Sequence, residues 1–132
     1  MHIGFLTPEY PHARVRHCAG IGSSLYNLVS ALLQKNIQVS VFVYGQDQDF
    51  FIAEGALNLY GIKQKSYPFG GFYLYRKYLN RKISKIIDSR HIDLLEVPDW
   101  TGISAFMKFR IPVVMRFHGS DTYFCGLEER PQ

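Results

Sequence analysis

The chain has 132 residues, of which 47% are hydrophobic and 20% are charged. This content supports one globular domain with an ordinary core, and it excludes a disordered or low-complexity chain. The formal net charge of +4 allows an anionic ligand or surface as a partner without requiring one.

The first residues lead directly into a strand pattern, without the basic start, apolar stretch and cleavage site of a signal peptide. No apolar run approaches the roughly 18 residues that a membrane-spanning helix needs. The two cysteines, Cys18 and Cys125, lie far apart and form no CxxC pair. We therefore expect a cytoplasmic protein with two free thiols.

Hydrophobic periodicity predicts strands and helices that alternate along the chain. Runs rich in β-branched and aromatic residues indicate strands, and apolar residues three and four positions apart indicate helices. The expected strands cover residues 2–6, 37–44, 92–97 and 112–117, with a weak strand at 56–60. Three helices are expected. The first begins near Gly22 or Ser23, and the other two cover residues 73–89 and 100–108.

This alternation predicts an α/β fold, a Rossmann-like parallel sheet with helices on both faces. In such sheets ligands bind beyond the carboxyl ends of the strands, where side chains are held by a rigid scaffold. The functional residues should therefore be sought in the segments that follow each strand.

Polar residues follow three of the predicted strands. They are Glu9 after the first strand, Glu96, Asp99 and Trp100 around the end of a later one, and His118 after the last. If the sheet is parallel, all of them lie at one edge. Purely structural roles stay open as well, since a strand-end histidine can simply support the fold, Trp100 can be a core residue and Glu9 can be an ordinary loop carboxylate.

A glycine turn opens the first predicted helix. The backbone amides from Gly20 to Ser23 and the helix dipole would attract an anion such as a phosphate, although an ordinary loop turn explains Gly-x-Gly equally well. The dinucleotide fingerprint does not fit, because Leu25 stands at its third glycine position. We do not expect an NAD enzyme.

The motifs TPEYP, AGIG, LYNLVSALLQKNIQVSVF, LLEVPDWTG and VVMRFHGSD together resemble the amino-terminal domain of family 4 glycosyltransferases, from residue 1 to about residue 126. The resemblance implies the GT-B architecture of two Rossmann-like domains. It also implies transfer of a sugar, with retention of configuration and usually without a metal, from a UDP- or GDP-sugar. The amino-terminal domain of the family binds chiefly the acceptor.

The resemblance also suggests roles for individual residues. Gly20 and Gly22, with Ser23 beside them, match the turn that lies against the donor diphosphate, although Ala19 replaces a usual glycine. His118 matches the histidine beside the transferred sugar, which makes it the candidate catalytic residue. The candidate acceptor-binding residues are Glu9, Glu96, Asp99 and Trp100.

On this interpretation residues 1–132 form one incomplete acceptor-side domain. The nucleotide-binding domain would be absent, the isolated domain would bind no cofactor and be inactive, and its uncovered surface could pair with a second copy. The alternative is a non-catalytic α/β module that binds an anion or nucleotide, or a partner, near residues 20–23.

The predicted helix at 73–89 is strongly basic on one side. This side is either solvated or in contact with anionic lipid headgroups at the inner face of the membrane, where the acceptor would lie. We expect no nucleic-acid partner, since no binding motif accompanies the charge. We also expect no metal, because no compact zinc spacing joins His17, Cys18, His118 and Cys125.

Overall fold

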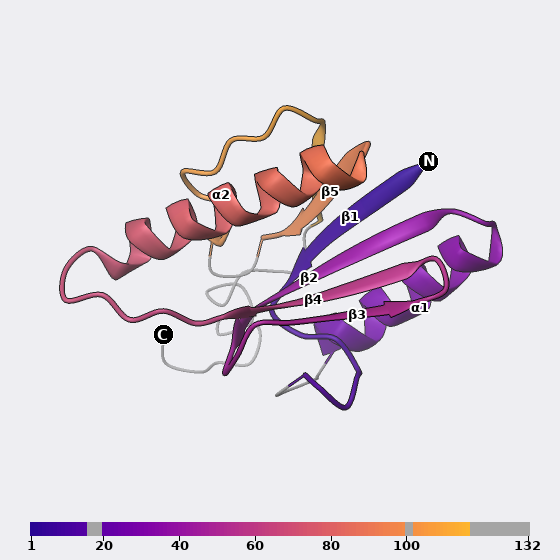
Figure 1. Ribbon diagram of the computed structural model, residues 1–132, viewed down its shortest axis with the longest axis horizontal. Helices are drawn as coiled ribbons and strands as arrows, with labels where there is room; N and C mark the ends of the chain where they lie inside the picture. The colour runs from indigo at the N-terminus through magenta and orange to yellow at the C-terminus, as the bar shows by residue number, and fades with distance from the viewer. Residues whose placement is uncertain (16–19, 100–101, 117–132) are drawn as a thin grey trace, which may run out of the picture.

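The computed structural model describes residues 1–15, 20–99 and 102–116. It contains the five predicted strands and the first two predicted helices, with shifts of a few residues at their ends, together with one strand that was not predicted (Figure 1). In chain order they are β1 (His2–Thr7), α1 (Gly20–Gln34), β2 (Gln38–Gln46), β3 (Phe50–Glu54), β4 (Leu57–Lys63), α2 (Gly71–Arg90), β5 (Leu94–Pro98) and β6 (Val113–Arg116).

The strands form one sheet in the order β3-β4-β2-β1-β5-β6. β1 pairs in parallel with β2 and β5, β2 with β4, and β5 with β6, and only β3 runs antiparallel to its neighbour. The predicted Rossmann-like α/β fold is confirmed. Because these strands are parallel, the carboxyl ends of β1, β5 and β6 lie at the same edge of the sheet.

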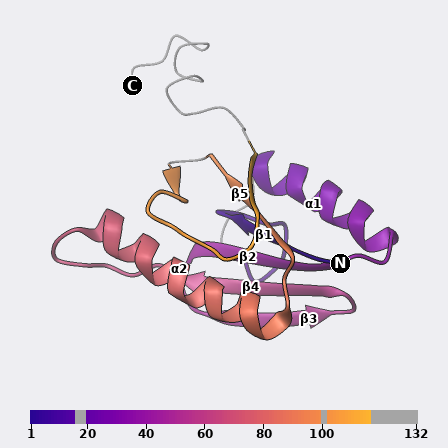
Figure 2. The ribbon, with the colours of Figure 1, turned by 90° about the horizontal axis from the view of Figure 1, so that it is seen from above.

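Each helix covers one face of the sheet, and Figure 2 shows α1 and α2 on either side of β1 and β2. β2 is buried along most of its length because it contributes to both cores. Val39, Val41 and Val43 pack toward α1, whereas Phe42 and Tyr44 pack toward α2. The largely apolar sequence of this strand therefore reflects a sheet that is covered on both sides.

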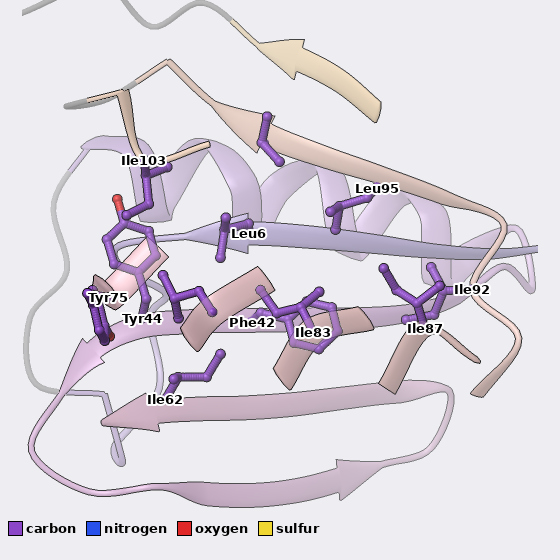
Figure 3. Packing of buried hydrophobic residues seen from close by; sticks show 12 residues of the cluster. Leu6, Phe42, Tyr44, Ile62, Tyr75, Ile83, Ile87, Ile92, Leu95 and Ile103 are labelled. Atoms are coloured by element: carbon purple, nitrogen blue, oxygen red, sulfur yellow. The ribbon is translucent and has the colours of Figure 1, made fainter. Parts of the chain in front are cut away.

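The core under α2 is drawn in Figure 3. Leu79, Ile83 and Ile87 descend from the helix onto Phe42 and Leu95 of the sheet, and all five side chains are nearly or fully buried. Their three- and four-residue spacing is the period that predicted this helix. Complete burial of each such side chain contributes roughly 1.5–3 kcal/mol relative to exposure.

The hairpin of β3 and β4 was largely missed by the sequence analysis, which expected one weak strand at 56–60. The two strands meet at a turn in which Gly55 has a φ of 60°. β3 is the edge strand and leaves much of its surface exposed. Its sequence, FFIAE, therefore carries little of the alternation that marks a half-buried strand.

The prediction of a short helix at residues 100–108 is wrong for the part of that range that the structure describes. Residues 103–106 form turns, and the bonds Ala105 N–H to Gly102 O and Met107 N–H to Ser104 O span only three residues. Both Gly102 and Phe106 have a positive φ, of 61° and 64°. A right-handed helix cannot continue through such residues.

Candidate site at the carboxyl edge of the sheet

A cavity of about 80 Å³ lies where the sequence analysis expected a site. It is bounded by the first turns of α1 and by the ends of β1, β5 and β6. The lining residues are Phe5, Leu6, Thr7, Ile21, Ser24, Leu25, Leu28, Glu96, Val97, Pro98 and Arg116. The parallel sheet thus brings four segments that are distant in sequence to one place.

The loop after β1 turns back to cover the start of α1. The Thr7 hydroxyl donates to the Glu9 carbonyl at 2.7 Å, and the Glu9 N–H donates to the Thr7 hydroxyl at 3.2 Å. Within this turn the Glu9 side chain is only 6% exposed, and its Oε1 accepts the Gly22 N–H at 2.9 Å. Glu9 therefore satisfies one of the amides at the helix start that have no partner within the helix.

The glycine turn itself is only partly accessible. Gly20 and Ser23 are exposed, whereas Gly22 is buried and its N–H bonds to Glu9. A Cβ atom added at Gly20 would meet nothing within 4 Å, so this residue has open space beside it. Of the neighbouring serines, Ser24 rather than Ser23 lines the cavity.

An ion pair closes the cavity on the side of β5 and β6. The Nε and Nη2 atoms of Arg116 lie 2.9 and 2.8 Å from Oε1 of Glu96. Arg116 pairs with Pro98 across the two strands, so Glu96 stands two residues away on the same face. The hydrogen bonds and the charge of Glu96 raise the pKa of Arg116.

Arg116 was not among the residues that the sequence analysis selected. The sequence could have indicated it, however, because Arg116 is the single charged residue of the apolar strand VVMR and stands at the end of that strand. Its side chain is 46% exposed, while that of Glu96 is only 13% exposed. The carboxyl group thus holds in place a guanidinium that still reaches solvent.

A family model described as Glycosyltransferase Family 4 matches residues 19–132. The chain belongs to glycosyltransferase family 4. The match includes the glycine turn, both helices and the Glu96–Arg116 pair, and it begins ten residues after Glu9. A search of curated proteins found no match.

Of the remaining predicted residues of this family 4 domain, the structure describes Asp99, which follows β5 directly. The Asp99 N–H donates to the Arg116 carbonyl at 3.2 Å, and the Asp99 carbonyl accepts the Gly102 N–H at 3.3 Å. Asp99 thus ties the ends of the two strands together, although it does not line the cavity. Trp100 and His118 lie outside the described residues, and His118 follows Arg116 by two positions.

The basic side of α2 is less uniform than the sequence analysis supposed. Arg76 is only 6% exposed, and burial lowers its pKa. Lys82 forms an ion pair with Asp49 at 3.0 Å. Further cations on this helix, Lys77, Arg81, Lys85 and Arg90, are exposed.

Two further observations concern the described part of this family 4 domain. Neither helix within residues 1–15, 20–99 and 102–116 has the length and apolar character needed to cross a membrane. The same ranges hold no cluster of three or more His, Cys, Asp or Glu side chains suited to a metal ion. His17, Cys18, His118 and Cys125, which the sequence analysis weighed as metal ligands, lie outside them.

Proposed function

We propose that this chain is the acceptor-side half of a retaining glycosyltransferase. The donor is a sugar attached to a nucleotide diphosphate, such as UDP or GDP, and the acceptor is a glycan, a lipid or a small molecule. The observation that carries the proposal is the cavity at the carboxyl edge of the sheet. In a family 4 chain, this cavity combines the start of α1 with a fixed arginine.

The chemistry of sugar transfer suits this arrangement. When the anomeric bond breaks, negative charge grows on the departing diphosphate and positive charge grows on the sugar. The amides and dipole at the start of α1 favour the anionic group. Arg116 adds a full positive charge, and its bonds to Glu96 fix its orientation before the substrate arrives.

His118 is the proposed catalytic residue. It follows Arg116 by two positions, and an imidazole there could donate or accept a hydrogen bond to a sugar hydroxyl near neutral pH. Glu96, Asp99 and Trp100 are proposed for the acceptor side. Glu9, which the sequence analysis also placed there, is buried against Gly22, so we assign it to the support of the glycine turn.

The nucleotide is proposed to bind chiefly to a second domain that follows this one in the whole enzyme. The 132-residue chain alone should therefore bind donors weakly and transfer no sugar. No metal is required, because amides and a guanidinium can stabilise the diphosphate. Transfer of sugar by the isolated chain would contradict this division of roles.

The test is an assay of the full-length gene product against a panel of nucleotide sugars, with NMR assignment of the anomeric configuration of the product. We expect the enzyme to transfer sugar from one of these donors, and His118→Ala should lower kcat for that donor by about a hundredfold or more. His91→Ala is the matched control, since this exposed residue ends α2. The absence of transfer from every donor, or full activity of His118→Ala, would overturn the proposal.

A further inference from the structure

Four aromatic rings are exposed at the first turn of α2. Phe69 is 85% exposed, Phe72 57%, Tyr73 43% and Phe106 64%. The ring of Phe106 lies 6.1 Å from that of Phe72 and 5.4 Å from that of Tyr73, edge to face in both cases. We call these four residues the aromatic end of α2.

The backbone holds these rings outward. Gly70 and Phe106 have φ values of 63° and 64°, so the chain turns sharply beside each ring. Arg76 joins the two segments, because its Nε donates to Gly102 O at 3.1 Å and its Nη1 to Phe72 O at 3.0 Å. Its guanidinium also lies 3.4 Å from the centre of the Phe72 ring. The buried arginine thus builds this surface rather than serving as one of its charges.

Positive side chains surround the aromatic end of α2. Lys77, Arg81 and Lys108 line one hollow together with Phe106. The Nζ atom of Lys77 lies 5.5 Å from the centre of the Tyr73 ring. Residues 55–87 contain seven Lys and Arg residues and no Asp or Glu, so no acidic side chain of this stretch offsets the charge.

Exposed aromatic rings beside lysine and arginine suit one environment in particular. At the surface of an anionic bilayer, rings enter the boundary between headgroups and acyl chains while cations meet the lipid phosphates. We propose that the aromatic end of α2 docks onto an anionic lipid surface. Phe69, Phe72, Tyr73 and Phe106 enter the interface, and Lys77, Arg81 and Lys108 contact the headgroups.

This docking would orient the candidate site. The Tyr75 hydroxyl accepts the Gly45 N–H of β2 at 3.1 Å and donates to the Lys63 carbonyl of β4 at 3.2 Å, which fixes the start of α2 at the carboxyl ends of these strands. The cavity opens at the same edge of the sheet. If the proposed transferase function holds, the acceptor belongs to the class of membrane lipids or lipid-linked sugars.

The contact is end-on, which distinguishes it from adhesion along the whole basic side of α2. Lys85 and Arg90 lie toward the other end of the helix, where the Arg90 guanidinium sits 5.5 Å from the ring of Phe51. Phe51 is itself 48% exposed, on the edge strand β3. The chain therefore offers matched controls of the same residue types away from the proposed contact.

The experiment is co-sedimentation of the 132-residue chain with vesicles of equal parts phosphatidylcholine and phosphatidylglycerol, and with vesicles of phosphatidylcholine alone. The chain should bind the anionic vesicles and be released by added salt. Lys77→Gln with Arg81→Gln should weaken binding roughly twentyfold, and Phe69→Ser with Phe106→Ser should weaken it by a similar factor. Lys85→Gln with Arg90→Gln, and Phe51→Ser, should bind like the wild type.

Several outcomes would overturn the proposal. They are equal binding to neutral vesicles, unchanged binding of the Phe69 and Phe106 variant, and equal losses in the control variants. A wild-type dimer that the aromatic substitutions convert to a monomer, without vesicle binding, would assign the surface to a second copy and would also overturn it.

Since the Phe69 ring is 85% exposed, Phe69→Ser alone keeps the test valid if the double variant unfolds. A transferase assay with water-soluble acceptors separates failure here from failure of the proposed function.

Discussion

The side-chain carboxylate of Glu9 accepts a hydrogen bond from the backbone N–H of Gly22 at 2.9 Å. A buried residue of the loop after β1 thus caps the first turn of α1. Glu9→Ala would leave a buried amide without an acceptor, which should lower the free energy of unfolding by about 1–3 kcal/mol. Glu9→Gln retains an acceptor oxygen and should lose less. Urea denaturation followed by circular dichroism measures both, with exposed Asp88→Ala as a control near zero.

Gly20→Ala separates folding from ligand binding. The new methyl group meets nothing within 4 Å, so the free energy of unfolding should change by less than about 1 kcal/mol. If the donor diphosphate approaches this turn, the methyl group lies in its way. Loss of one hydrogen bond to a charged group should then reduce affinity for UDP or GDP about tenfold. NMR titration measures this, and Gly71→Ala, equally unobstructed at the start of α2, is the control. Equal affinities in the two variants would argue against a diphosphate at Gly20.

Arg116→Gln should affect ligand binding more than stability. The ion pair with Glu96 is partly solvated on the arginine side, and such pairs contribute only about 1 kcal/mol or less. A guanidinium that meets a diphosphate is worth more, so nucleotide affinity should fall about tenfold or more. The two effects are separated by urea denaturation and by titration with UDP and GDP. A variant that binds nucleotide normally would remove Arg116 from the proposed site.

Gly61→Ala tests the β3–β4 hairpin. Gly61 of β4 faces Phe50 of β3, and a Cβ atom there would overlap the phenyl ring. The ring must move aside, which should lower the free energy of unfolding by about 1–3 kcal/mol. Phe50→Ala removes the clash, so the double variant should be more stable than the sum of the two single effects predicts. Additive losses would mean that the ring does not lie over Gly61.

The elements that the sequence predicted well share one property, which is that their burial leaves a regular pattern. α2 repeats its apolar residues with the helical period, and β2 is largely apolar because both of its faces are covered. β3 lies at the edge and leaves no such pattern. The turn at residues 103–106 depends on the positive φ values of Gly102 and Phe106, which no periodicity reports.

Some residues of the candidate site could likewise be predicted from the sequence, and others could not. The alternation of strands and helices implies a parallel sheet whose carboxyl edge carries the site, so Gly20 and Glu96 were expected there. The roles of Glu9 and Arg76 depend on contacts 13 and 26 residues along the chain, with Gly22 and Gly102, and a local pattern cannot show these. His118 as a site residue remains a prediction from the family resemblance.

His2 should make folding sensitive to mild acid. The side chain is buried, with its Nε2 atom 2.7 Å from the Ser40 hydroxyl and its Nδ1 atom 3.1 Å from the Arg90 carbonyl. Burial lowers the pKa of His2 below its usual value of 6.5, although the bond to Arg90 and the charge of Asp93 oppose this. The unfolded chain therefore takes up a proton at His2 more readily than the folded chain.

The contribution of His2 to the free energy of unfolding is fully present above pH 6.5. It decreases as the pH drops toward the lower pKa of His2 in the folded state. Urea denaturation across this interval should show the free energy of unfolding decreasing with falling pH. His2→Gln should flatten this slope, whereas His91→Gln, at an exposed residue, should retain it. Because the comparison uses slopes, it holds even if His2→Gln is less stable at every pH. Equal slopes in the wild type and His2→Gln would show that another group is responsible.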